Sequence, residues 1–348
     1  MFRFSLPAAV LAASSAPLWA DVPAVATDIA PVQALVAQVM KGVGEPALIV
    51  PPAASPHGYA MRPSEARALS GADLVVWVGP ALTPWLAEPL ETLAGEAQHL
   101  ALMAQPGTRV LGFREGARFE AHDHGDDEGH GDVHHEDEGH DHEGHDHDGH
   151  DHEGHNHEGH ADEAHADPAG HDGHGHGSDD PHVWLDPRNG QLWLGQIAVT
   201  LAELDPDNAA QYRANAAAAQ AELAALEGEI AERLAPVKDR PFIVFHDAYH
   251  YFEARFDIEA VGAISENDAR TPGAARVAEL RELVRDSGAK CVFAEPQFNP
   301  GLIAAVSEGQ GIKTGTLDPI GAELAPGAGL YTDLLRGMAE GMANCLSD

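Results

Sequence analysis

Residues 207–235 read DNAAQYRANAAAAQAELAALEGEIAERLA, an alanine-rich stretch with no proline inside it. Its larger apolar side chains recur at intervals of three and four, the spacing of one face of an α-helix. A helix of this length extends about 45 Å at 1.5 Å per residue. The stretch therefore predicts one long, rigid helix, and we place this linking helix at residues 206–236.

The segments on both sides of the helix alternate short apolar runs with amphipathic ones. The runs expected to form buried strands are 22–27, 46–52, 73–79 and 110–113 before the helix, and 241–245, 258–264, 290–296 and 313–319 after it. Such alternation is typical of a parallel sheet covered by helices. The predicted fold is α/β, with an N-terminal lobe at 21–205 and a C-terminal lobe at 237–348.

One segment of the first lobe has a very different composition. His122 to His176 contains 18 of the 23 histidines, and residues 120–180 hold 22 of the 56 acidic residues with no Lys or Arg. A segment with so little apolar surface cannot offset the entropy of ordering, so we expect a disordered loop at 120–180. Imidazoles alternating with carboxylates are ligands that suit zinc, copper or nickel.

Charge and hydropathy restrict where the protein acts. The 348 residues carry a net charge of −36, which argues against nucleic acid and anionic membranes as partners. Residues 1–20 read MFRFSLPAAVLAASSAPLWA, the pattern of a secretory signal peptide, and no later apolar run is long enough to insert into a membrane. We expect an exported, soluble protein. In such a protein the two cysteines suggest a disulfide, with two buried free thiols as the alternative.

Five histidines lie outside the histidine-rich segment. They are His57, His99, His182, His246 and His250. His57 and His246 follow predicted strands, and His182 precedes a predicted helix, so all three could meet where ligands of open α/β sheets collect. Three imidazoles with one open position suit tetrahedral Zn²⁺. The alternative is that each is an ordinary solvated side chain.

Five short segments raise the weight of the metal hypothesis. They are SPHGYAMRPSE (55–65), DPHVWLDP (180–187), FHDAYHYFE (245–253), FAEPQF (293–298) and TLDPIG (316–321). In this order they resemble the solute-binding proteins of metal ABC transporters (cluster 9, or cluster A-I), above all the periplasmic zinc-binding, ZnuA-like branch. The resemblance covers essentially the whole mature chain. It implies two α/β lobes with largely parallel four-stranded sheets, one long joining helix and a metal in the cleft.

The same resemblance implies roles for individual residues. His57, His182 and His246 match the zinc ligands of the family, and Asp318 matches a carboxylate that some members place at the fourth position. Water is the alternative fourth ligand, and Asp318 would then be a turn carboxylate that binds its own loop. Some members use a glutamate before the first histidine, where this chain has Pro56.

Further residues receive supporting roles by the same comparison. Cys291 and Cys345 match the disulfide of the family. Glu295 is expected to hydrogen-bond a ligand rather than bind the metal. His250 is expected to lie beside the site or in solvent, and His99 to be structural.

The predicted function is high-affinity zinc capture in the periplasm and delivery to the membrane permease of a zinc ABC transporter. We expect a monomer that is not an enzyme, and the chain has no P-loop for nucleotide hydrolysis. The histidine-rich loop would gather or sense zinc at weaker sites. The alternatives are a zinc storage or buffering protein and a three-histidine zinc hydrolase.

Overall fold

The computed structural model describes residues 22–114, 119, 179–265 and 274–347. The elements before the long helix are β1 (Val25–Thr27), α1 (Ala30–Val39), β2 (Ala47–Leu48), α2 (Pro63–Ser70), β3 (Leu74–Trp77), η1 (Pro84–Leu86), α3 (Ala87–Leu93), β4 (Gln98–Ala101), η2 (Val183–Leu185), α4 (Pro187–Leu204) and η3 (Pro206–Asn208). The long helix is α5 (Ala209–Leu234), followed by η4 (Ala235–Val237). The remaining elements are β5 (Phe242–His246), α6 (His250–Phe256), β6 (Ala260–Ser265), α7 (Ala274–Ser287), β7 (Cys291–Ala294), α8 (Pro300–Ser307), β8 (Lys313–Thr316) and α9 (Leu330–Leu346).

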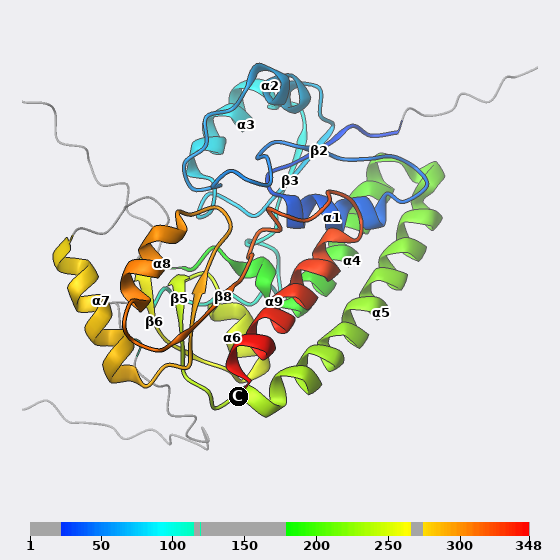
Figure 1. Cartoon of the computed structure of the whole chain (residues 1–348). Coiled ribbons are helices and arrows are strands. Elements are labelled where there is room, and N and C mark those ends of the chain that lie inside the picture. Colours follow the sequence, from blue (N-terminus) through cyan, green and yellow to red (C-terminus); the bar gives the residue numbers. More distant parts are fainter. Residues whose placement is uncertain (1–21, 115–118, 120–178, 266–273, 348) are drawn as a thin grey trace, which may run out of the picture. The chain divides into compact units, whose positions relative to one another are not determined.

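The strands form two sheets of four, one on each side of α5 in the sequence. Their orders are β2-β1-β3-β4 and β6-β5-β7-β8, and every pairing within them is parallel. The two sheets therefore share one topology, which confirms the predicted α/β fold with two lobes (Figure 1). The predicted limits of the lobes, 21–205 and 237–348, stay predictions.

The long helix α5 forms as its sequence predicts and has 26 residues. One stripe of the helix is buried, made of Tyr212, Ala216, Ala219, Leu223, Leu226, Ile230 and Leu234. This stripe packs on α4 and α1 of the first lobe and on α9 of the second (Figure 1). One continuous apolar cluster therefore runs from β1 and α1 through α5 to β5 and α9.

The prediction for the last strand of the first sheet was wrong. The structure pairs Gln98–Ala101 with β3, whereas Val110 to Phe113 contributes only an isolated bridge between Gly112 and Asp179. The sequence QHLA has two polar side chains and no apolar run, and both are exposed because β4 lies at the edge of its sheet. Val110 and Phe113 are partly exposed and pack in no sheet.

The predicted disulfide between Cys291 and Cys345 is present, and it joins β7 to α9 within the second lobe. No helix among the described residues is long and apolar enough to cross a bilayer. The signal peptide predicted at 1–20, and all of the loop predicted at 120–180 except its last two residues, lie outside the described residues.

Candidate metal centre

His246, one of the three predicted histidine ligands, is the last residue of β5, a central strand of the second sheet. Its neighbour β7 ends at Ala294, so Glu295 follows at the same edge. The Nδ1 of His246 lies 2.7 Å from Oε1 of Glu295. Because a carboxylate can only accept, Nδ1 donates, and the ring is held with Nε2 pointing away from the carboxylate.

His182 is held in the same way by a different carboxylate. It stands directly before η2, where Oδ1 of Asp180 accepts from its backbone N–H (3.0 Å) and lies 2.7 Å from its ring Nδ1. Asp180 is fully buried. Burial raises the pKa of Asp180 to about 7, against the lowering effect of the His182 backbone N–H. This contact fixes the ring so that its Nε2 also points away from its carboxylate.

The two Nε2 atoms that result from these contacts face each other. Nε2 of His182 and Nε2 of His246 are 3.4 Å apart, and both side chains are buried. Two nitrogens that bind one tetrahedral zinc ion at about 2.0–2.1 Å lie about 3.4 Å from each other. The pair therefore already has the separation that one zinc ion requires.

His57 approaches this pair from the loop after β2. Its ring centroid lies 5.4 Å from that of His182, in an edge-on arrangement. The loop is held by Trp85, whose Nε1–H donates to the Pro56 carbonyl at 2.8 Å. The structure thus brings together the three histidines that the sequence singled out.

The space between these histidines is small. A cavity of about 30 Å³ lies there. It is lined by Ser55, Pro56, His57, His182, Trp184, His246, Glu295, Gln297, Phe298, Pro319 and Ile320. This volume holds one ion or one water, whereas sites for organic ligands have about 300–1,000 Å³. Within the described ranges, no set of three His, Cys, Asp or Glu side chains is arranged so that it could already hold a metal ion. The ring centroids of His57 and His246 lie at similar distances from that of His182, 5.4 Å and 5.3 Å, and all three histidines line the cavity.

Asp318, the tentative fourth ligand, is bound to its own loop. Its Oδ1 accepts from the backbone N–H of Gly321 at 2.8 Å and of Ile320 at 3.3 Å, and its Oδ2 accepts from that of Glu323 at 3.1 Å. Asp318 is not among the residues that line the cavity, although its neighbours Pro319 and Ile320 are. These contacts match the turn role that the sequence left open for it.

The two remaining histidines lie elsewhere. His250 is the first residue of α6 and does not line the cavity. Burial, followed by the Arg114 cation, holds the pKa of His250 below its ordinary value. His99 lies on β4, with its Nε2 2.8 Å from the Ala94 carbonyl.

Sequence reasoning selected Glu295 correctly as a hydrogen-bonding partner and overlooked Asp180. The signal for Asp180 was present, because a carboxylate two residues before a histidine can reach both its backbone N–H and its ring. Trp184 and Phe298, which form walls of the cavity, carried no comparable signal.

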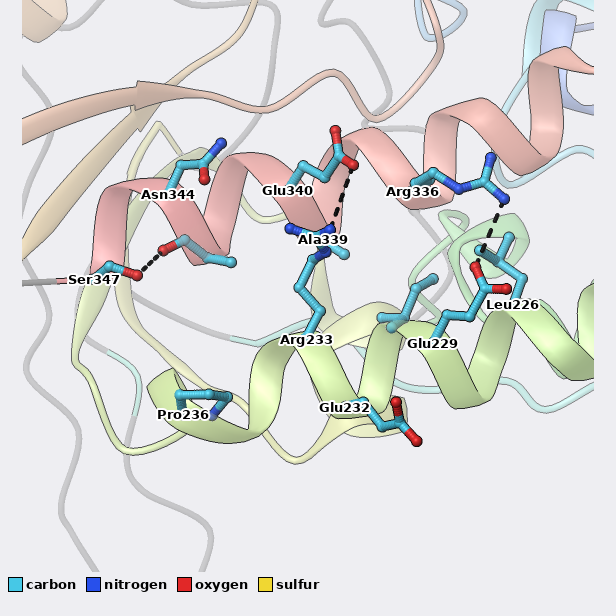
Figure 2. A pocket seen from close by; sticks show the side chains of 12 residues that line it. Leu226, Glu229, Glu232, Arg233, Pro236, Arg336, Ala339, Glu340, Asn344 and Ser347 are labelled. Carbon is cyan, nitrogen blue, oxygen red and sulfur yellow. Dashed lines mark hydrogen bonds and ion pairs between the residues drawn. The ribbon is translucent and has the colours of Figure 1, made fainter.

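A much larger cavity lies between α5 and α9, on the second lobe's side of the long helix (Figure 2). Its volume is about 620 Å³, and its lining contains arginines and glutamates but no His or Cys. Arg336 pairs there with Glu229 at 3.8 Å, and Arg233 with Glu340 at 3.8 Å (Figure 2). Zinc prefers nitrogen and thiolate ligands, so the small cavity is the candidate metal site.

Known proteins supply an independent comparison. The family model described as zinc-uptake complex component A, periplasmic, matches residues 25–345. The high-affinity zinc uptake system protein ZnuA of Brucella suis biovar 1 is 49% identical over 323 residues, or 93% of this chain and 91% of that protein. The protein of the same name from Paracoccus denitrificans is 48% identical over 340 residues, or 97% and 96% of the two chains.

Solved structures agree on the fold. A crystal structure of ZnuA superposes with a TM-score of 0.67 at 24% identity, covering 93% of this chain and 98% of that one. A zinc-bound ZnuA with residues 138–173 deleted gives a TM-score of 0.66, also at 24% identity and with the same coverage. With two like-ordered parallel sheets, a family match across 25–345 and relatives near 49% identity, the chain belongs to the ZnuA family of periplasmic zinc-uptake components.

Proposed function

We propose that this protein captures zinc between His57, His182 and His246 in the periplasm and delivers it to the membrane permease of an ABC transporter. The observation that carries the proposal is the facing pair of Nε2 atoms, 3.4 Å apart, in a cavity with room for one ion. The zinc uptake named in the relatives supports the choice of metal. Zinc is the cargo of the protein.

For the ligand set we propose the three histidines and one water. Asp318 has both carboxylate oxygens engaged by backbone N–H groups of its own loop. Binding a metal would require it to give up these contacts and to enter a cavity that it does not line. A water fits the open fourth position of a tetrahedral site without such a rearrangement.

The nitrogen-rich donor set supports selectivity for zinc. Sites rich in carboxylate and water suit Mn²⁺ and Mg²⁺, whereas imidazole suits zinc, copper and nickel. The carboxylates of Asp180 and Glu295 contact the Nδ1 atoms of His182 and His246 and so hold the two rings. Such contacts fix the tautomer and make the metal-facing nitrogen more basic.

The small volume of the cavity argues against the alternative of a zinc hydrolase. Hydrolysis requires space for a substrate beside the metal-bound water, and the cavity of about 30 Å³ holds one ion. The family is a solute-binding component of a transporter. We therefore propose capture without catalysis.

The remaining features of the proposal come from the sequence. Residues 1–20 would direct export, and the net charge of −36 of the full chain suits a soluble monomer that does not bind nucleic acid. The histidine-rich segment would gather or sense zinc at sites weaker than the cleft. Storage by this segment alone is the competing proposal, and it predicts several weak sites without a tight one.

A competition titration tests the proposal. Zinc is added to the full chain in the presence of a chelator of known affinity, so that only tight sites are observed. We expect one tight site, weakened by orders of magnitude in His182→Ala and in His246→Ala. The control is His99→Ala on β4, whose ring contacts the Ala94 carbonyl just after α3 and does not line the cavity, and it should keep wild-type affinity. Wild-type affinity in both ligand variants would reject the site.

A further inference from the structure

Arg114 makes a buried contact between the two lobes. It belongs to the segment after β4, in the first lobe, and its side chain is only 6% exposed. Its side chain contacts two carboxylates of the second lobe, Asp247 and Glu253. Its Nε lies 3.1 Å from each carboxylate oxygen of Asp247, its Nη1 donates to Oε2 of Glu253 at 2.6 Å, and its Nη2 contacts both residues.

The guanidinium of Arg114 lies among buried charged and aromatic side chains. Asp247 and Glu253 are themselves buried, at 7% and 2% exposure. Burial opposes the charged form of Arg114, but the two carboxylates outweigh it, and its pKa lies above the ordinary range. The ring of Phe119 covers the guanidinium at 4.0 Å from its centroid. The planar fork of arginine presents five N–H donors in fixed directions and can bind carboxylates bidentately, whereas lysine has three donors on a single nitrogen.

The contacts lead directly to His246. Asp247 is the next residue after His246 at the end of β5. Glu253, on α6, also accepts from the backbone N–H of Ala260 at the start of β6. Arg114 therefore links the end of β5, which carries His246, to α6. Through Glu253 the same contacts extend to the start of β6.

The same segment leads to His182. Leu111 donates its backbone N–H to the Tyr251 hydroxyl at 2.8 Å, and its carbonyl accepts from the backbone N–H of Asp180 at 2.8 Å. The Tyr251 hydroxyl in turn donates to the Asp180 carbonyl at 2.7 Å. Asp180 holds the ring of His182. One short segment, residues 111–114, thus contacts Asp180, which holds the His182 ring, and Asp247, the residue next to His246.

We propose that Arg114 is a positioning residue of the metal centre, which sets the separation of His182 and His246 by tying their supporting segments together across the lobes. This inference rests on the proposed function of the three-histidine site. It extends that proposal to a residue that touches neither the metal nor a ligand ring. The chemistry required at this position is a cation with a planar fork.

The test compares three variants of the full chain. Arg114→Lys keeps the charge and loses the fork. The triple variant Arg114→Met, Asp247→Asn, Glu253→Gln removes the ion cluster without leaving a buried carboxylate unpaired, which protects folding. Arg336→Met is the matched control, because this arginine also pairs with two carboxylates but is exposed. Its partners are Glu229 on α5 (Figure 2) and Asp333 on its own helix.

Two quantities are measured for each variant: the zinc dissociation constant by chelator competition, and the visible absorption spectrum with one equivalent of Co²⁺. We expect the triple variant to raise the dissociation constant about 10- to 100-fold, the range for groups that support metal ligands. Its cobalt spectrum should change in intensity. Arg114→Lys should fall between wild type and the triple variant, and Arg336→Met should match wild type in both measurements.

A purely structural role for Arg114 gives a different result. A cooperatively unfolding triple variant with wild-type zinc affinity and cobalt spectrum would overturn the proposal. If that variant does not fold, Arg114→Lys decides in the same way by the same two measurements. If wild type itself has no tight site, the proposed function fails before Arg114 is at issue.

Discussion

The two sheets have the same strand order but use the same position differently. In both sheets the strand order reverses between the two central strands, because successive strands are added first on one side and then on the other. These central strands are β1 and β3 in one sheet and β5 and β7 in the other. At this place the first lobe has Asp28, whose carboxylate accepts from the backbone N–H groups of Ile29 and Val78, both at 2.8 Å. The second lobe has His246, whose ring contacts Glu295.

The difference shows that the same strand order provides a place for a binding site in both lobes, but the residues there decide whether a ligand can bind. Ligands of open α/β sheets collect where the strand order reverses. In the first lobe a buried carboxylate closes this place by tying two strand ends together, whereas in the second lobe a carboxylate holds a histidine whose other nitrogen faces a cavity. The first lobe contributes its histidines from loops, at His57 and His182.

The largest expected effects come from replacing the two corresponding side chains. His246→Ala should weaken zinc binding by at least about a thousandfold, because it removes a direct ligand, and should change stability little. Asp28→Ala should lower the free energy of unfolding by about 2–4 kcal/mol, because two buried N–H groups lose their acceptor. Its zinc affinity should stay near wild type. Chelator competition and chemical denaturation measure the two effects, and a loss of zinc binding in Asp28→Ala would break the comparison.

The pH dependence of stability also separates Asp28 from an ordinary surface carboxylate. Burial raises the pKa of Asp28 to about 7, against the backbone N–H groups that bind it. A raised pKa means that the folded state holds a proton that the unfolded chain has released. The stabilising contribution is therefore full below about pH 4, the unfolded value, and is lost as the pH rises to about 7. The free energy of unfolding, measured by denaturation at pH 5 and at pH 8, should fall more between these two values for wild type than for Asp28→Ala. Equal decreases in the two proteins would contradict this role of Asp28.

A smaller effect is expected for the carboxylate behind His246. Glu295→Gln replaces an anion by a neutral acceptor, which makes the imidazole a weaker ligand. The zinc dissociation constant should rise about 10- to 100-fold. Glu308→Gln is a suitable control, because Glu308 is exposed and, within the described residues, forms its ion pair with Arg281 on the surface. If Glu295→Gln binds zinc as wild type does, the contact between Glu295 and His246 is structural, like that of Asp28.

Asp318→Asn should change zinc affinity less than about threefold, because we assign Asp318 to its own loop. Asparagine has one acceptor oxygen where aspartate has two, so the loop should lose hydrogen bonds, each worth about 1 kcal/mol. Denaturation detects that loss. A decrease in zinc affinity of about a hundredfold or more would instead make Asp318 the fourth ligand, as the family resemblance allows.

The smallest effect on the cleft is expected from removing the histidine-rich segment, which interrupts only the first lobe. Deletion of residues 122–176 should leave the tight site unchanged and remove the weaker ones. Zinc titrations with and without a competing chelator distinguish the two classes of site. Loss of the tight site would contradict the proposed division between cleft and segment.

Much of this arrangement could be predicted from the sequence because it depends on local patterns. The apolar run PFIVF predicted β5, and the spacing of Tyr212 to Leu234 predicted α5. The three histidines were selected because each stands beside a predicted strand or helix. The sequence did not predict β4, because QHLA lies at a sheet edge, where a strand does not need an apolar run.

The supporting contacts were harder to predict because they join distant parts of the chain. Arg114 meets Asp247 across 133 residues, and His246 meets Glu295 across 49. Nothing in the local sequence of Arg114 distinguishes it from a surface arginine, since its burial follows from how the segment after β4 packs on α6. The place of Glu295 at the end of a predicted strand, in a motif of the family, pointed to it, and nothing pointed to Arg114.

Diffraction from crystals of the zinc-loaded full chain, with anomalous data across the zinc edge, tests whether zinc binds between the three histidines. We predict the strongest anomalous peak in the cavity of about 30 Å³, bonded at about 2.0–2.1 Å to Nε2 of His182, to Nε2 of His246 and to a ring nitrogen of His57. A strongest peak outside this cavity, or one bonded to neither His182 nor His246, would contradict it.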